Sequence, residues 1–210
     1  MNINKCYQRL SIGCIVCLSF IFGATITVDQ AGTGYTTITS GIGAASTGDT
    51  VYVKSGFYIE KAIVNKQITL LGAGYATTTI QNGSHALYVN SSDVKIKGFT
   101  FYSTAENSVY VSTSQFEISN CVIKGPSSSY AGLYMSSSGT INNCVFRDAF
   151  YGVDHSSGTL YINNCLFYNT QHRAINTNST IYCFNSIFIN NNYAWHSSGS
   201  RNTYYNNYYN

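Results

Sequence analysis

A six-residue segment occurs almost unchanged at two places, INNCVF at 141–146 and INNCLF at 162–167. A weaker copy, CFNSIF, begins at Cys183, and each copy starts 21 positions after the one before. Self-similarity at a period of about 20 to 50 residues is typical of solenoids, in which each repeat packs only against its neighbours. The repetition therefore limits the fold more than any other feature of the chain.

An eight-residue unit around these segments aligns without internal gaps at six places. Apolar residues alternate along it, as they do in strands, and its fifth position tolerates a left-handed backbone because it is always Gly or Asn. We predict a strand, a sharp bend and a second strand in each unit. The fifth positions, spaced by 22, 23, 21, 21 and 21 residues, are Gly98, Asn120, Asn143, Asn164, Asn185 and Asn206.

A third short strand is predicted upstream of each unit. Three strands in about 21 residues, with no helical pattern between them, describe one turn of a parallel β-helix. Neighbouring turns would then stack about 4.8 Å apart, so that equivalent residues form ladders along the axis. The upstream strands are expected at 87–89, 109–111, 133–135, 153–155, 175–177 and 195–197.

The register explains the cysteines of the repeats. Cys121, Cys144 and Cys165 would lie above one another and point inward, as a stack of buried thiols. Zinc is disfavoured because ligands on one wall cannot surround a metal tetrahedrally. A disulfide between adjacent turns is left open on Cα distance alone. The Asn residues at the bends are interpreted as a ladder of amides that hydrogen-bond one another.

The first 24 residues differ from the rest. Lys5 and Arg9 precede an apolar run of about fifteen residues, which is typical of a secretory signal peptide and short for a membrane anchor, the alternative. We predict a signal peptide at 1–24 and a single domain at 25–210 without a membrane span. Within it, 25–80 forms a cap and irregular first turns, and 81–210 forms regular turns of about 21–23 residues. The protein is thus expected to be secreted or at the cell surface.

The N-terminal part of the domain carries a family resemblance. Thr37 to Ser46 has apolar residues at helical spacing, and GDTVYV, GFYIE and ITLLGAG follow. This order resembles the opening of right-handed parallel β-helix proteins of the pectin lyase-like superfamily, such as pectate lyases and pectin methylesterases. The resemblance extends from Ile26 to the C-terminus. It implies an all-β, right-handed parallel β-helix of about seven turns, closed by a short N-terminal helix, that engages polysaccharide outside the cell.

The catalytic motifs of these families are not recognisable. The two aspartate motifs and the Arg-Pro-Trp segment of pectin methylesterases have no match, and GVDH at Gly152 is only superficially similar to polygalacturonase motifs. The calcium-binding acids of pectate lyases are not recognisable either. Whether the chain is an enzyme is therefore left open. If it is an enzyme, a lyase-like activity on acidic polysaccharide is expected.

The outward residues of the upstream strand give the candidate site, because side chains alternate between the two faces of a strand. Three tyrosines are candidate sugar-binding residues, since aromatic side chains near polar groups suit sugar rings. The alternative is a cross-strand stack that only stabilises the sheet. The row, with one residue per turn, is Tyr88, Tyr110, Tyr134, Asp154, Asn176 and His196.

The chemistry of this row changes toward the C-terminus. Asp154, Arg173 and His196 are candidate catalytic residues, with Arg173 neutralising a sugar carboxylate while Asp154 or His196 takes a proton. Asn176 and His172 are candidate substrate-binding residues beside them. The alternative is that the charged residues are solvated turn residues. His155 is expected to point inward as a buried, hydrogen-bonded histidine.

The low content of charged residues excludes some classes of binding partner. The formal net charge is +3 and only 9% of residues are charged, so no basic face for nucleic acid is expected. The eight acidic residues form no cluster, so no metal site or cofactor is predicted, with calcium as a weaker alternative. The predicted function is binding of pectin-like or other acidic polysaccharide along one sheet, with or without processing. A noncatalytic adhesin or surface-structural protein is the alternative.

Overall fold

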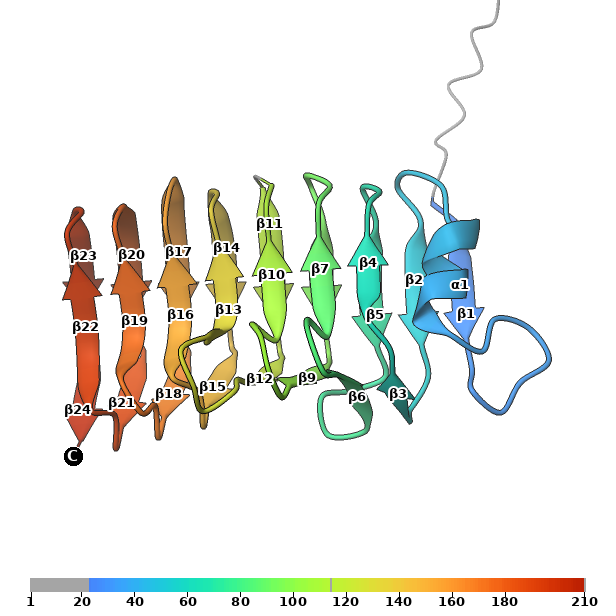
Figure 1. Ribbon diagram of the computed structural model, residues 1–210. Coiled ribbons are helices and arrows are strands. Elements are labelled where there is room, and N and C mark those ends of the chain that lie inside the picture. The colour runs from blue at the N-terminus through green and yellow to red at the C-terminus, as the bar shows by residue number, and fades with distance from the viewer. Residues whose placement is uncertain (1–22, 114, 210) are drawn as a thin grey trace, which may run out of the picture.

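Each repeat folds into one turn of a solenoid, because its three strands pair in parallel with the equivalent strands of the turns before and after. The computed structural model, which describes residues 23–113 and 115–209, contains three sheets that run along one axis (Figure 1). The predicted all-β parallel β-helix is thus confirmed. The signal peptide predicted at 1–24 lies almost wholly outside the described residues.

The three sheets follow one another in every regular turn. Sheet A consists of β1 (Thr25–Val28), β2 (Thr50–Val53), β5 (Thr69–Gly72), β8 (Lys95–Lys97), β11 (Phe116–Ser119), β14 (Gly139–Asn142), β17 (Thr159–Asn163), β20 (Thr180–Phe184) and β23 (Arg201–Tyr204). Sheet B consists of β3 (Gly56–Ile59), β6 (Thr78–Asn82), β9 (Thr100–Ser103), β12 (Val122–Lys124), β15 (Val145–Arg147), β18 (Leu166–Tyr168), β21 (Ile187–Ile189) and β24 (Asn207–Tyr209). Sheet C consists of β4 (Ala62–Val64), β7 (Leu87–Val89), β10 (Val109–Val111), β13 (Ala131–Met135), β16 (Tyr151–His155), β19 (Arg173–Thr177) and β22 (Tyr193–Ser197).

The number of turns is larger than predicted. The nine strands of sheet A mark about nine turns along the axis, where about seven were expected. The additional turns come from the N-terminal segment, where β1 pairs with β2 and β2 with β5 in the same parallel register. This segment lacks the Asn-marked bend of the later repeats, so the sequence period does not extend to it.

The predicted capping helix is present as α1 (Ile38–Ala44), which packs on β1, β2 and β4 at one end of the solenoid (Figure 1). Ile38 and Ile42 are its buried apolar residues. The carboxylate of Glu60 accepts hydrogen bonds from the Ile38 and Thr39 backbone N–H groups, at 2.8 and 2.9 Å. At the C-terminal end of α1, Lys66 Nζ donates to the carbonyls of residues 42, 43 and 45. Both charges complement the helix dipole and hold the cap in place.

The interior consists of ladders of like residues. Phe146, Phe167 and Phe188 stack from turn to turn, with ring centroids 5.0 and 4.9 Å apart. The three cysteines at 121, 144 and 165 occupy equivalent inward positions and are buried, as predicted. They are free thiols, so the disulfide that the sequence left open is not formed between them. Because each ladder position is buried against the turns on both sides, the core is continuous along the axis.

The bends between sheets A and B have the left-handed backbone that the Asn residues predicted. The φ angles of Asn120, Asn143, Asn164 and Asn185 lie between 50° and 53°. The proposed amide ladder at these positions is wrong, because in the described residues their side chains do not hydrogen-bond one another. Their backbone N–H groups bond to the next turn instead, and amide pairing occurs beside them, where Asn163 Nδ2 donates to Asn142 Oδ1 at 3.0 Å.

The last repeat is displaced by one residue from the predicted alignment. Tyr204 pairs with Phe184, and Tyr205, with φ of 56°, occupies the bend predicted for Asn206. The turn before β23 is one residue shorter than the period assumed. The Asn206 side chain instead accepts from the Ser186 N–H at 2.8 Å and donates to the Cys183 carbonyl at 3.0 Å. Asn206 therefore stabilises the last turn by hydrogen bonding rather than by its backbone conformation.

Replacing Asn164 tests the contribution of the bends. We expect Asn164→Ala to lower the free energy of unfolding by about 1 kcal/mol, because a residue with a Cβ and no polar side chain disfavours the left-handed region. Asn164→Gly is the matched control and should change stability by less, since glycine adopts this conformation freely. Urea unfolding midpoints measure both variants. Equal midpoints for the two variants would show that the bend conformation does not limit stability.

Candidate functional site

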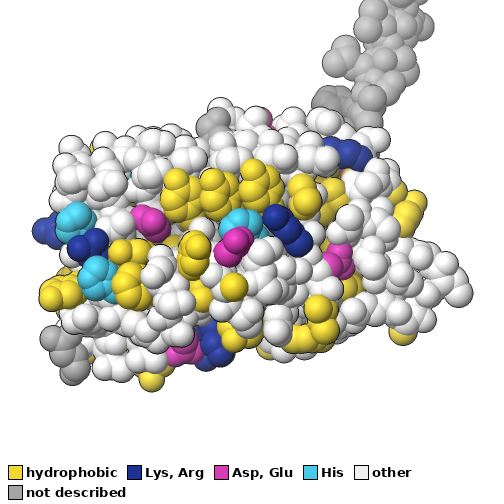
Figure 2. Space-filling view, in the orientation of Figure 1, with side chains coloured by type: hydrophobic (Ala, Val, Ile, Leu, Met, Phe, Trp, Pro, Cys, Tyr) yellow, Lys and Arg dark blue, Asp and Glu magenta, His cyan; other side chains and the backbone are white. Residues whose placement is uncertain are grey.

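The outer row of sheet C carries one side chain per turn, in the register that the repeat predicted. The strands that carry the row, from β7 to β22, pair in parallel with one another. Ile63 of β4 occupies the equivalent position in the turn before Tyr88. Figure 2 shows a line of hydrophobic side chains, a class that there includes Tyr, across this face, with acidic, basic and histidine side chains beside it. The row runs through Tyr88, Tyr110, Tyr134, Asp154, Asn176 and His196.

The three tyrosines form a stack. The ring centroids of Tyr88 and Tyr110 are 5.2 Å apart with planes 5° from parallel, and those of Tyr110 and Tyr134 are 4.9 Å apart. Both faces of the Tyr110 ring are therefore covered, and burial raises the pKa of its hydroxyl. The stack presents ring edges and hydroxyl groups to a ligand. The faces of the Tyr110 ring are thus occupied by its neighbours and are not free to pack against a sugar ring.

Charged groups that sequence reasoning missed flank the tyrosine stack. Lys61 Nζ lies 5.2 Å from the centroid of Tyr88. The ring of His85 lies 5.0 Å from that of Tyr110, and its Nε2 lies 3.4 Å from Glu106 Oε2. These residues belong to the turns before the strands, whose lengths differ between repeats. Aligning the residues just upstream of each sheet C strand would have revealed them.

Asp154, Asn176 and Arg173 form a hydrogen-bonded cluster next to the tyrosines. Asn176 Nδ2 donates to Asp154 Oδ1 at 2.7 Å, and Arg173 Nη1 donates to Asn176 Oδ1 at 2.9 Å. Burial raises the pKa of the Asp154 carboxyl, while the Asn176 hydrogen bond and the charges of His155 and Arg173 oppose that shift. The guanidinium of Arg173 also lies 6.0 Å from the centroid of Tyr151. The cluster holds one cation and one carboxylate at fixed positions on the face.

The three histidines near this cluster lie in different environments. His155 is buried, as predicted, with Nδ1 3.0 Å from Thr177 Oγ1 and Nε2 3.2 Å from the Ser137 carbonyl. His172 packs on the ring of Phe150, with centroids 4.9 Å apart, and burial lowers its pKa, as do the charges of Arg173 and His196. His196 is exposed on β22, two turns from Asp154.

The predicted catalytic residues therefore do not all converge. Asp154 and Arg173 share Asn176 between them, whereas His196 lies about 10 Å further along the axis, at roughly 4.8 Å per turn. The buried Nδ1 of His172 has no hydrogen-bond partner in residues 23–113 and 115–209. The arrangement can recognise hydroxyl and carboxylate groups of an extended ligand. Of the three candidate catalytic residues, Asp154 and Arg173 are the two that the structure brings together, through Asn176.

Other groups do not add to this site. The four cysteines 121, 144, 165 and 183 are buried in the core. No group of three or more metal-ligating side chains occurs in the part of the chain that the structure describes. No helix in that part is long and apolar enough to cross a bilayer.

The stacked turns and the outward-facing, mostly half-buried row define the class of protein as a parallel β-helix with an accessible sheet face. The family model described as "Right handed beta helix region" matches residues 73–208. The chain therefore belongs to this family. A search of curated proteins found no match.

Solved structures support the same fold. A pectin methylesterase from carrot is 14% identical, with a TM-score of 0.58, and the match covers 89% of this chain and 82% of that one. The rice weevil pectin methylesterase is 11% identical, with a TM-score of 0.56, over 89% and 87% of the two chains. The catalytic domain of a GH87 alpha-1,3-glucanase in complex with nigerose is 10% identical, with a TM-score of 0.57, over 90% and 41%. Identities this low establish the fold alone, which is the pectin lyase-like fold that the sequence resembles.

Proposed function

We propose that this chain is a secreted or cell-surface protein that binds an acidic polysaccharide along the outer face of sheet C. The observation that carries the proposal is the unbroken line from the Tyr88–Tyr110–Tyr134 stack into the Asp154–Asn176–Arg173 cluster. Structural likeness to proteins named as pectin methylesterases and a glucanase supports a polysaccharide ligand.

The charges on this face favour an anionic chain. Lys61 precedes β4 and Arg173 begins β19, so the two cations lie about 24 Å apart along the axis, at roughly 4.8 Å per turn. Between them, the tyrosine hydroxyls can donate hydrogen bonds to sugar oxygens. A uronate polymer lying along the axis would place carboxylates near both cations. The proposal is binding without cleavage. In the lyase-like alternative, Asp154 would take the proton while Arg173 neutralises the sugar carboxylate.

Two variants test this binding. Arg173→Gln is expected to weaken binding of polygalacturonate or alginate by about tenfold or more, because it removes a charge-assisted hydrogen bond. Tyr110→Phe retains the ring stack and removes one hydroxyl, so a loss of about two- to tenfold is expected. Isothermal titration calorimetry against both polymers and a neutral glucan measures the affinities. Thermal melts check that the variants remain folded.

Lys97→Gln provides the matched control, since it removes one exposed cation from the outer face of sheet A. If Lys97→Gln and Arg173→Gln lowered the affinity equally, binding would depend only on the net charge of the protein, and this result would contradict a site on sheet C. Absence of binding to either acidic polymer would favour the surface-structural alternative. Following the same mixtures for new unsaturated sugar ends tests cleavage. Product that disappears in Asp154→Asn would establish the lyase-like version and overturn binding without cleavage.

A further inference from the structure

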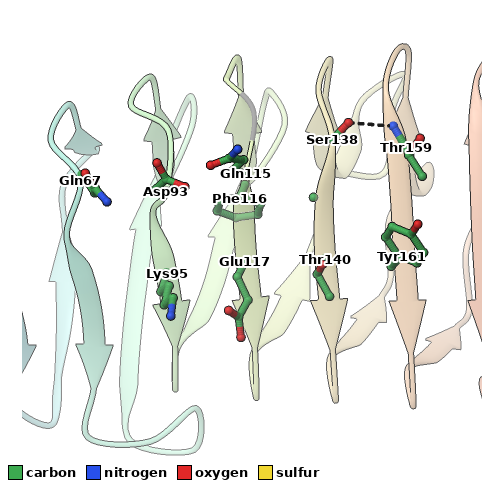
Figure 3. A pocket seen from close by; sticks show the side chains of 11 residues that line it. Gln67, Asp93, Lys95, Gln115, Phe116, Glu117, Ser138, Thr140, Thr159 and Tyr161 are labelled. Carbon is green, nitrogen blue, oxygen red and sulfur yellow. Dashed lines mark hydrogen bonds between the residues drawn. The ribbon is translucent and has the colours of Figure 1, made fainter. Parts of the chain in front are cut away.

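A groove of about 670 Å³ lies on the outer face of sheet A and shares no lining residue with the row on sheet C. Figure 3 shows the side chains that line it. Four successive strands, β8, β11, β14 and β17, form its floor. Their paired outward residues are Lys95, Glu117, Thr140 and Tyr161, in that order. The surface is hollow because the small Thr140 stands between the longer Glu117 and Tyr161 side chains.

Tyr161 provides an aromatic wall with one open face. Its ring stacks on Tyr182 of the next turn, with centroids 5.0 Å apart and planes 11° from parallel. On the other side its neighbour is Thr140, which carries no ring, and Tyr161 remains 44% exposed. This differs from Tyr110 on sheet C, which has a tyrosine on both sides. A free ring face beside a groove is the surface on which the C–H face of a pyranose packs.

Polar groups of the groove are available to a ligand. Glu117 and Lys95 are neighbours in register, yet neither side chain forms an ion pair or hydrogen bond with another described residue. Along the rim, the Thr159 N–H donates to Ser138 Oγ at 3.0 Å, and the Gln115 N–H donates to the Ser138 carbonyl at 3.1 Å. The rim is thus held in place by the fold, whereas the charged groups below it remain free for recognition.

The charge of the groove selects against acidic ligands. The carboxylates of Asp93 and Glu117 outnumber the single amine of Lys95 among the lining residues. The four strands span about 14 Å along the axis, at roughly 4.8 Å per turn. We propose that this groove binds an uncharged pyranose oligosaccharide, with one ring stacked on Tyr161 and hydroxyl groups bonded to Glu117 and Lys95. This site is independent of the function proposed for sheet C, because the two surfaces share no residue.

Titration with cellotetraose and chitotetraose tests the proposal, with tetragalacturonate as the acidic comparison. Tyr161→Ala is expected to weaken binding of the uncharged tetramer by about tenfold, because the stacking surface is lost. Glu117→Gln keeps the shape of the side chain and is expected to weaken binding by about threefold or more. Chemical shift changes in the wild-type protein should centre on β11, β14 and β17.

Tyr168→Ala is the matched control, because Tyr168 is similarly exposed, at 41%, but lies on sheet B. Its affinity should stay within about twofold of the wild type, since it is remote from the groove. Three results would overturn the proposal: no binding of either uncharged tetramer at about 1 mM, equal losses for the two tyrosine variants, or preferential binding of tetragalacturonate in the groove. Arg173→Gln should leave the affinity for the uncharged tetramers unchanged, which separates this site from that on sheet C.

Discussion

Phe167→Ala is expected to lower the free energy of unfolding by about 3 to 5 kcal/mol, the usual cost of removing a buried aromatic ring. Phe167 is completely buried and stacks on Phe146 and Phe188 at centroid distances of 5.0 and 4.9 Å. The substitution would remove the contacts of both neighbouring turns at once. Each turn is supported only by its neighbours, so the cavity would interrupt the core at that point.

Urea unfolding followed by circular dichroism measures this loss. Tyr168→Ala is the matched control, because Tyr168 is the next residue of the same strand and points outward. It should change stability by less than about 1 kcal/mol, as expected for a surface substitution. Similar losses for the two variants would contradict the assignment of Phe167 to the core ladder.

Alkaline pH is expected to destabilise the fold steeply. Burial raises the pKa of the Cys165 and Cys183 thiols from 9.0 to about 12, and the pKa of Cys144 well above 9.0. Above about pH 9 the unfolded chain releases these protons while the folded chain keeps them. The unfolded state therefore binds fewer protons, and stability falls as pH rises, by about 1.4 kcal/mol per thiol per pH unit. For Cys165 and Cys183 together the slope is about 3 kcal/mol per pH unit.

Melting temperatures measured from pH 8 to pH 11 test this slope. The double variant Cys165→Ala/Cys183→Ala should lose stability at pH 8 because of the smaller side chains, yet show a shallower decline above pH 9. Tyr58, Tyr110 and Tyr208, whose pKa values are also raised by burial, contribute to the decline in both proteins. Parallel curves for the wild type and the double variant would show that the thiols do not cause the alkaline loss.

Much of the fold follows from local sequence pattern. Alternating apolar residues and the Asn or Gly bends recur at a nearly constant period, and parallel stacking converts that period directly into contacts. The same reasoning placed Tyr88, Tyr110 and Tyr134 on one outer line and His155 in the interior. Each of these predictions depends only on strand alternation and on recognising the equivalent strand in every repeat, although the repeats differ slightly in length.

The incorrect or missing predictions concern repeats of unusual length, repeats without the Asn marker, and a surface whose shape is determined by side-chain packing. The shorter last turn moves Tyr205 into the bend expected for Asn206. The early turns lack the Asn marker, so two of them were not counted. The groove on sheet A depends on Thr140 being small beside Tyr161, a difference in side-chain size between adjacent turns. A pattern that scores residues as apolar or polar cannot detect such a difference.

The constant register has an evolutionary consequence. Duplicating or deleting one whole turn of about 21 residues leaves every remaining side chain in its sheet and on its face. The near-identity of INNCVF and INNCLF in β14 to β15 and β17 to β18 is the trace expected of such a tandem duplication. A single duplication or deletion of one turn would therefore lengthen or shorten both proposed binding surfaces by one row of outward residues, and the fold of the other turns would stay the same.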